Sequence, residues 1–227
     1  MRPVGIKPRR PGALRAAAVA LALATATLVV AAKPSSKAPA PPPAPPPVEV
    51  GDTPANLRAA FTHEMNAKEW YLAAARRAQQ EGRFSAMQLF LACAKSEEIH
   101  ARRHVEAIAV TSGEARAVLD RVAVGGTDDN LRAALERERW SAEVFYPALL
   151  ERARADRATA AVRSMTYAMS AEREHVRLLE AELQSAEAGV AARTLRVCPT
   201  CGKTVEAVDF GRCPVCFTGA AGFVSIT

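Results

Sequence analysis

Two short patterns in the sequence place a glutamate and a histidine three residues apart. Glu97 and His100 lie in "EEIHARRH", and Glu172 and His175 lie in "EREH". Residues three apart on a helix share a face, so each pair could give a carboxylate oxygen and an imidazole nitrogen to one metal ion. One such pair alone is usually a charged surface feature, so the interpretation depends on what accompanies it.

Each pair follows a further glutamate at a matched distance. Glu64 precedes Glu97 by 33 residues, and Glu138 precedes Glu172 by 34. An Asn-Leu pair stands eight and seven residues before each of these first glutamates: Asn56-Leu57 and Asn130-Leu131. This internal repeat indicates two equivalent halves, each with one glutamate on its first helix and Glu-x-x-His on its second.

The four glutamates share helical faces with apolar residues, so they are expected to point into a core. A buried carboxylate without a partner is unfavourable, and four together repel one another. Two divalent cations balance four carboxylates, and oxygen and imidazole ligands suit iron or manganese. Glu98, near Lys95 and Arg102, is one step off that face and is expected to be solvated, as is Glu174.

Hydrophobic periodicity and helix-breaking residues predict the elements that must hold these side chains. Four helices are expected, at about 53–80, 84–109, from 127 onward, and 157–188. Thr53 and Thr127 are expected to cap the first and third helices. Pro147 removes a backbone hydrogen bond and should bend the third helix. Two antiparallel hairpins joined by a longer connection would form one four-helix bundle.

The N-terminal segment has the composition of a leader. Residues 1–32 contain five basic residues and no acidic one, and residues 16–32 are 17 uncharged, mostly apolar residues. They are expected to be a signal peptide or, as the alternative, an uncleaved N-terminal anchor. Residues 33–51 follow as a linker with eight prolines. The protein is therefore expected to be exported, and to be periplasmic or membrane-tethered facing the periplasm.

The distribution of charge excludes one class of function. The 227-residue chain has a formal net charge of +6, but the leader contains five of its 30 Lys and Arg residues. The remaining 25 basic residues nearly balance the 24 acidic ones. Because a nucleic-acid-binding face needs a concentrated basic patch on the folded part, nucleic-acid binding is not expected.

Four of the five cysteines form a second metal-binding pattern. Cys198 and Cys201 are followed, after eleven intervening residues, by Cys213 and Cys216, each pair in a CPxC motif. Four cysteines at this spacing indicate a site for one iron or zinc ion, with disulfides as the alternative in an exported protein. Cys93 lies in an apolar helical stretch and is expected to be a buried small residue.

The whole arrangement resembles the rubrerythrin family of ferritin-like di-iron proteins. The resemblance lies in "NLRAAFTHEMNAKEWY", "EEIHARRH", "NLRAALERERWSAEVFYP", "EREH" and the two CPxC knuckles, over about residues 53–226. It implies an all-α ferritin-like four-helix bundle at 52–190 and a small rubredoxin-like four-cysteine metal domain at 196–227. It also implies six iron ligands: Glu64, Glu97, His100, Glu138, Glu172 and His175.

The resemblance also implies that two tyrosines lie beside the irons. Tyr71 and Tyr146 stand seven and eight residues after the first glutamate of their repeats, with plain core tyrosines as the alternative. His104, one turn beyond the first ligand histidine, is expected behind the ligands rather than in a separate zinc site. His63 is expected to be structural or exposed.

The sequence departs from the family at one position. Rubrerythrins usually carry a further glutamate three residues after the ligand of the third helix, and that position is Ser141 here. The remaining two glutamates and two Glu-x-x-His motifs match the general ferritin-like di-iron set. The iron movement that the extra carboxylate supports in the family is therefore not carried over.

The resemblance implies a non-haem di-iron oxidoreductase that reduces hydrogen peroxide to water with electrons relayed through an iron in the four-cysteine site. The catalytic set would be Glu64, Glu97, Glu138, Glu172, Tyr71 and Tyr146. Its partners would be peroxide or dioxygen, an unidentified electron donor, and further copies in a homodimer or larger homo-oligomer. Two alternatives stay open: a ferroxidase or iron-handling protein, and a non-catalytic interaction module loaded with zinc.

Overall fold

A computed structural model describes residues 47–111, 113–185 and 194–226. The expected leader and most of the proline-rich linker lie outside the described residues. Within these ranges, no helix combines the length and the apolar character that crossing a membrane requires.

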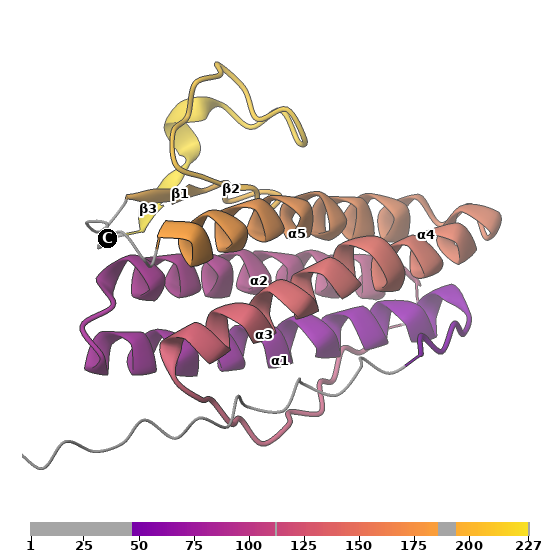
Figure 1. The fold of residues 1–227 in the computed structure, drawn as a ribbon. Helices are drawn as coiled ribbons and strands as arrows, with labels where there is room; N and C mark the ends of the chain where they lie inside the picture. The colour runs from indigo at the N-terminus through magenta and orange to yellow at the C-terminus, as the bar shows by residue number, and fades with distance from the viewer. Residues whose placement is uncertain (1–46, 112, 186–193, 227) are drawn as a thin grey trace, which may run out of the picture. The chain divides into compact units, whose positions relative to one another are not determined.

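Four helical arms make up a bundle, which confirms the predicted fold class (Figure 1). The first hairpin is α1 (Thr53–Gln80) and α2 (Phe84–Thr111), with Gly82 in the left-handed region at the turn. The third arm runs without a break through α3, a π-helical turn η1 and α4, and it pairs with α5. Their bounds are Thr127–Trp140, Ser141–Phe145, Tyr146–Ala155 and Thr159–Ser185. Contacts between α2 and α5 join the hairpins.

The asparagines of the repeated Asn-Leu pairs make the same two hydrogen bonds at the start of each half. The side-chain amide of Asn56 accepts from the N–H of Gly51 at 2.9 Å and donates to its carbonyl at 3.2 Å. Asn130 makes the same two bonds with Gly125, at 2.8 and 3.1 Å. Each asparagine therefore satisfies backbone groups that precede its helix and fixes how the chain enters the bundle.

The two threonines expected as N-caps have another role. Asp52 caps α1 by accepting from the N–H of Ala55, and Gly126 holds the cap position of α3. Thr53 instead donates to Asp156 at the end of α4, at 2.8 Å. Thr127 donates both its N–H and its hydroxyl to Glu81 at the end of α1. The start of each half is thereby hydrogen-bonded to the end of the first helical arm of the other half, a long-range pairing that helix-cap statistics do not contain.

The π-helical turn explains an irregularity in the repeat. The N–H of Tyr146 donates to the carbonyl of Ser141, five residues back, so the turn holds one residue more than an α-helical turn. Tyr71 follows its glutamate by seven residues and Tyr146 by eight, and the extra residue returns Tyr146 to the equivalent face. Pro147 follows the π-turn directly, and the bend expected at this proline stays a prediction.

The connection between the hairpins crosses α1. Its described part, 113–126, contains no helix. The indole N–H of Trp70 donates to the carbonyl of Ala123 at 3.0 Å, and Asn66 bonds Val118 and Asp120. These bonds anchor the crossover that joins the two halves.

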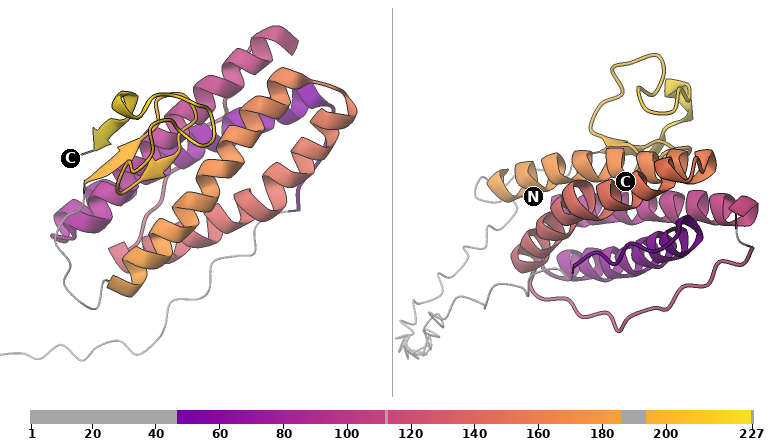
Figure 2. Two further views of the ribbon diagram at one scale, coloured as in Figure 1. Left: turned by 90° about the horizontal axis from the view of Figure 1, so that it is seen from above. Right: turned by 90° about the vertical axis from the view of Figure 1, so that its right-hand side faces the viewer.

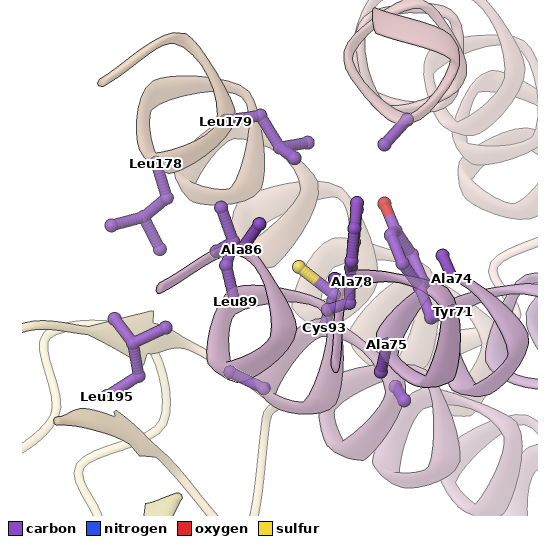
Figure 3. Close-up of a cluster of buried hydrophobic side chains, with 14 of the residues drawn as sticks. Tyr71, Ala74, Ala75, Ala78, Ala86, Leu89, Cys93, Leu178, Leu179 and Leu195 are labelled. Carbon is purple, nitrogen blue, oxygen red and sulfur yellow. The ribbon is translucent and has the colours of Figure 1, made fainter. Parts of the chain in front are cut away.

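The C-terminal segment forms a three-stranded antiparallel sheet in the order β2-β1-β3, with bounds Leu195–Val197 (β1), Thr204–Val205 (β2) and Val224–Ile226 (β3). The sheet lies over α2 and α5 (Figure 2). Leu195 of β1 belongs to the same buried cluster as Leu89 of α2 and Leu178 of α5 (Figure 3). The four-cysteine module is therefore packed against the bundle through apolar side chains.

Removing one residue from the π-turn should leave Tyr71 and Tyr146 on the helix faces that point toward the metal ligands. We expect deletion of exposed Glu143, combined with Pro147→Ala so that a regular helix can form, to keep the bundle folded and its metal content unchanged. The matched control deletes exposed Arg132 from α3, which turns buried Leu131 by about 100° and should cost at least about 2 kcal/mol. Urea unfolding and metal analysis compare the two, and equal damage from both deletions would contradict the inserted-residue interpretation.

Candidate metal centres

The structure gathers the six predicted ligands of the bundle in one buried cluster. One ligand comes from α1, one from α3, and a Glu-x-x-His pair from each of α2 and α5, and none is more than 2% exposed. They form two groups whose ligand atoms lie within 4.8 Å of one another: Glu64, Glu97, His100 and Glu172 in one, and Glu97, Glu138, Glu172 and His175 in the other. Glu97 and Glu172 belong to both groups, as ligands that bridge two ions would.

The donor set fits two cations. One oxygen each of Glu97, Glu138 and Glu172 is buried without a hydrogen-bond partner among the described residues. Leaving three such oxygens unsatisfied would be strongly unfavourable, whereas metal ions would satisfy them. The Nδ1 atoms of both histidines also face the carboxylates, that of His100 lying 2.8 Å from Glu97 and that of His175 lying 3.2 Å from Glu172.

Without metal, the cluster retains protons. Burial and the neighbouring carboxylates raise the pKa of Glu97 well above its usual range, and burial together with Glu172 raises the pKa of Glu138 to about 7. Burial opposes the charged form of His175, but the charges of Glu138 and Glu97 and the hydrogen bonds to Glu138 and Glu172 together outweigh it, so the pKa of this histidine is also raised. Metal ions would replace these protons, so binding and pH are linked at this site.

Two buried tyrosines link the halves of the repeat. The hydroxyl of Tyr71 donates to Glu138, and that of Tyr146 donates to Glu64. Each tyrosine therefore bonds the glutamate of the opposite half. Hydrogen bonds to a carboxylate contribute about 1.5–3 kcal/mol each, so the pair fixes both glutamates against the centre.

Ser141, at the position where the family usually has another glutamate, is fully buried. Its hydroxyl lies 2.8 Å from Nε2 of half-buried His63, whose ring packs in a tilted arrangement against Trp140 and Phe145. Exposed Glu143 points away and does not take over the missing carboxylate. A neutral pair thus fills the space beside Glu138, and the cluster keeps four carboxylates.

The four C-terminal cysteines form a separate compact site. The Sγ atoms of Cys198 and Cys216 are 3.4 Å apart and those of Cys201 and Cys213 are 3.6 Å apart. Tetrahedral coordination at about 2.3 Å gives sulfur separations of about 3.8 Å, whereas a disulfide bond is about 2.05 Å long. The geometry fits one tetrahedral metal ion. Cys93 is buried in the apolar core, as expected.

The first cysteine knuckle packs directly on the ligand histidines. Nε2 of His100 lies 3.3 Å from the carbonyl oxygen of Cys201, and Nε2 of His175 lies 3.2 Å from the hydroxyl of Thr204. Ser96 donates to the carbonyl of Gly202 at 2.8 Å. Each histidine thus faces the carboxylates through Nδ1 and the cysteine module through Nε2, which fixes the orientation of both rings.

Sequence patterns located the ligands but not the groups that orient them. Ser96 and Thr204 hold the junction between the cysteine module and the ligand histidines. No sequence pattern marks either residue, since an isolated hydroxyl carries no spacing signal. Glu98 is exposed, as predicted, and pairs with Lys95 at 2.7 Å, whereas Arg102 bonds the carbonyl of Pro199. His104 is buried behind the ligands.

The raised pKa values give a pH prediction for metal-free protein. Above pH 6.5, the ordinary value for histidine, Glu97, Glu138 and His175 hold more protons in the folded chain than in the unfolded one. The free energy of unfolding should therefore fall as pH rises from 6.5 through about 7 and beyond. Urea unfolding of chelator-treated protein at several pH values tests this, and saturating metal should remove the decline. A rise over the same window would contradict it.

A methyl group at Gly202 should separate the cysteine module from the bundle. Its Cβ would lie 2.3 Å from Nε2 of His100, and the residue has φ +78°. We expect Gly202→Ala to keep the four-cysteine metal but to lose hydrogen-exchange protection at residues 199–204.

The control for this substitution is Phe217→Ala. Phe217 holds the corresponding place after the second knuckle, with φ 63°, but is 70% exposed. Unchanged protection at residues 199–204 in Gly202→Ala would show that the knuckle does not need this close approach.

Comparison with known proteins agrees with this architecture. The family model described as Rubrerythrin matches residues 55–183. Rubrerythrin-2 of Clostridium acetobutylicum is 31% identical over 164 residues, covering 70% of this chain and 89% of that protein. Nigerythrin of Nitratidesulfovibrio vulgaris is 30% identical over 169 residues, covering 74% and 83%.

Solved structures show the same fold. A nigerythrin structure in its fully reduced, all-ferrous state has a TM-score of 0.73 at 29% identity, covering 78% of this chain and 88% of that one. Bacterioferritin BfrA of Mycobacterium tuberculosis, at 18% identity and a TM-score of 0.55, shares the fold. Because the family model spans more than half of the chain and both relatives align over most of it, this chain belongs to the rubrerythrin family, with the ligand set of a di-iron site and a four-cysteine site.

Proposed function

We propose that this protein reduces hydrogen peroxide to water and that the four-cysteine site holds the iron through which electrons enter. The observation that carries the proposal is the junction between the cysteine knuckle and the ligand histidines. A zinc-loaded interaction module would have no need for the carbonyl of Cys201 to lie against His100. Family membership supports oxidoreductase chemistry, and the junction supports an electron route into the buried centre.

The reaction takes two electrons and two protons per peroxide and yields two waters. Two ferrous ions, when bound, supply the electrons that the O–O bond accepts. The chain contributes a water-poor cluster in which Glu97 and Glu172 face both ion positions. Tyr71 and Tyr146 hold hydroxyl hydrogens on Glu138 and Glu64, so proton donors stand at both sides of the centre.

We also propose that the protein is exported, on the basis of the leader-like composition of residues 1–32. The resemblance favours a homodimer or larger assembly, and an exported protein would draw electrons from a donor outside the cytoplasm. The junction is formed within one chain, so electron entry through it does not require a partner subunit.

Ferroxidase activity is the second candidate, and Ser141 is the observation that favours it. With a serine and His63 where the family usually has a carboxylate, the ligand set is that of ferritin-like proteins in general. An iron-handling protein would turn over added ferrous ions, whereas a peroxidase would oxidise only the irons it retains.

Stopped-flow mixing of the reduced, iron-loaded protein with peroxide tests the proposal. We expect rapid oxidation of the di-iron chromophore followed by oxidation of the four-cysteine iron, with about two electrons consumed per peroxide. Gly202→Ala should leave the first phase and slow the second, while Phe217→Ala should leave both.

Two results would contradict peroxide reduction. One is an absent or very slow first phase in fully loaded protein. The other is consumption of many ferrous ions per site under turnover, which would favour the ferroxidase. Zinc without iron in protein purified from its native compartment would remove both redox candidates.

A further inference from the structure

A chain of hydrogen bonds leads away from Glu64 through Tyr146. Tyr146 donates to Glu64, the hydroxyl of Tyr146 lies 3.1 Å from Nε2 of His104, and Nδ1 of His104 lies 2.5 Å from Oγ of Ser164. None of the four side chains is more than 4% exposed. This hydrogen-bonded chain of side chains therefore crosses the interior from α1 through α4 and α2 to α5.

The outer end of this chain reaches a cavity. Ser164 lines a space of about 320 Å³ together with Arg103, Tyr167 and Thr200, between α2, α5 and the first cysteine knuckle. The space is polar enough, and large enough, to hold several water molecules. Ser164 is thus the group through which water in this cavity could join the chain.

The donor and acceptor in each of these hydrogen bonds follow from the Glu64 end, where the carboxylate accepts. A tyrosine hydroxyl has one hydrogen, and Tyr146 uses it on Glu64. Its oxygen must then accept from Nε2–H of His104. A neutral imidazole with its hydrogen on Nε2 has Nδ1 as an acceptor, so Ser164 must donate to Nδ1. All hydrogens in the chain point toward Glu64.

Among the described residues, no corresponding hydrogen-bonded chain starts from Glu138 in the other half of the repeat. The position four residues after the ligand histidine is His104 in the first half and Leu179 in the second. Tyr71, the counterpart of Tyr146, lies in an apolar cluster with Cys93 and Leu179 (Figure 3). One tyrosine–glutamate bond is therefore enclosed by the core, and the other continues toward a cavity.

We propose that His104 and Ser164 are positioning residues that keep the hydroxyl hydrogen of Tyr146 directed at Glu64. Water in the cavity over Ser164 then supplies protons to this side of the metal centre. The arrangement makes the two metal positions unequal although the ligand repeat makes them alike. The inference concerns the metal site itself and rests on the proposed function only for its effect on rate.

The first test measures the tautomer of His104 in full-length, zinc-loaded protein labelled with ¹⁵N at its four histidines. The loss of one signal set in His104→Gln identifies the residue. We expect a neutral ring with hydrogen on Nε2 and none on Nδ1. Hydrogen on Nδ1, a doubly protonated ring, or direct coordination of the metal by His104 would overturn the proposal. This measurement does not depend on any activity.

The second test compares variants by the resonance Raman signal of Tyr146, isolated by subtraction of a Tyr146→Phe spectrum. His104→Leu, which copies the second half, and Ser164→Ala should change the hydrogen-bond state of this tyrosine. His104→Gln, whose amide can donate from near the Nε2 position, should restore it. Thr166→Val is the control, because that hydroxyl on α5 donates to the carbonyl of Val162 in its own helix.

Peroxide kinetics then relate the geometry to the proposed function. Oxidation of the reduced centre should slow roughly tenfold to hundredfold in His104→Leu and recover in His104→Gln. An unchanged Tyr146 signal in His104→Leu and Ser164→Ala, with only lower thermal stability, would show a purely structural role and overturn the positioning claim. If no variant or parent reacts with peroxide, the function fails while the tautomer and Raman results still decide the inference.

Discussion

Four carboxylates buried within one cluster are the constraint on which the rest of this structure depends. Their mutual repulsion and lost hydration would oppose folding unless protons or cations offset the charge. Three carboxylate oxygens without a hydrogen-bond partner among the described side chains show that protein groups alone do not satisfy the cluster. The bundle is therefore a scaffold that metal completes, and its metal-free form retains protons where ions would bind.

The chain solves this problem by using each half of the repeat to support the other. The tyrosine of one half bonds the glutamate of the other, and the first helical residue of each half bonds the end of the first helical arm of the opposite half. These bonds are reciprocal, so neither half contains a finished site. The π-turn at 141–145 also supports this pairing of the halves, because it keeps Tyr146 on the helix face toward Glu64 despite one extra residue.

The two halves of the repeat differ at residues close to the ligands. His104 has a leucine as its counterpart, and Ser141 meets a histidine where the family usually has a carboxylate. The cysteine module likewise packs on one side of the bundle and contacts both ligand histidines through a single knuckle. A nearly symmetric ligand set thus lies in an asymmetric surrounding, because the hydrogen-bonded chain from Glu64 continues to Ser164 whereas Tyr71 is enclosed by the apolar core.

The sequence by itself determined the four helices, the six bundle ligands and the four cysteines, because each depends on spacing within one helix or one knuckle. Residues three apart share a helical face whatever surrounds them, and two copies of one pattern remove the ambiguity of a single Glu-x-x-His. Only the tertiary structure decided the partners that those residues acquire. Several hydroxyl side chains bond a group that the packing of distant segments, or a turn shaped by that packing, brings near. They are those of Thr53, Thr127, Ser96, Thr204 and Ser164. A hydroxyl has no preferred spacing that would reveal such a partner, so the orientation of the ligands, unlike their identity, could not be read from the sequence.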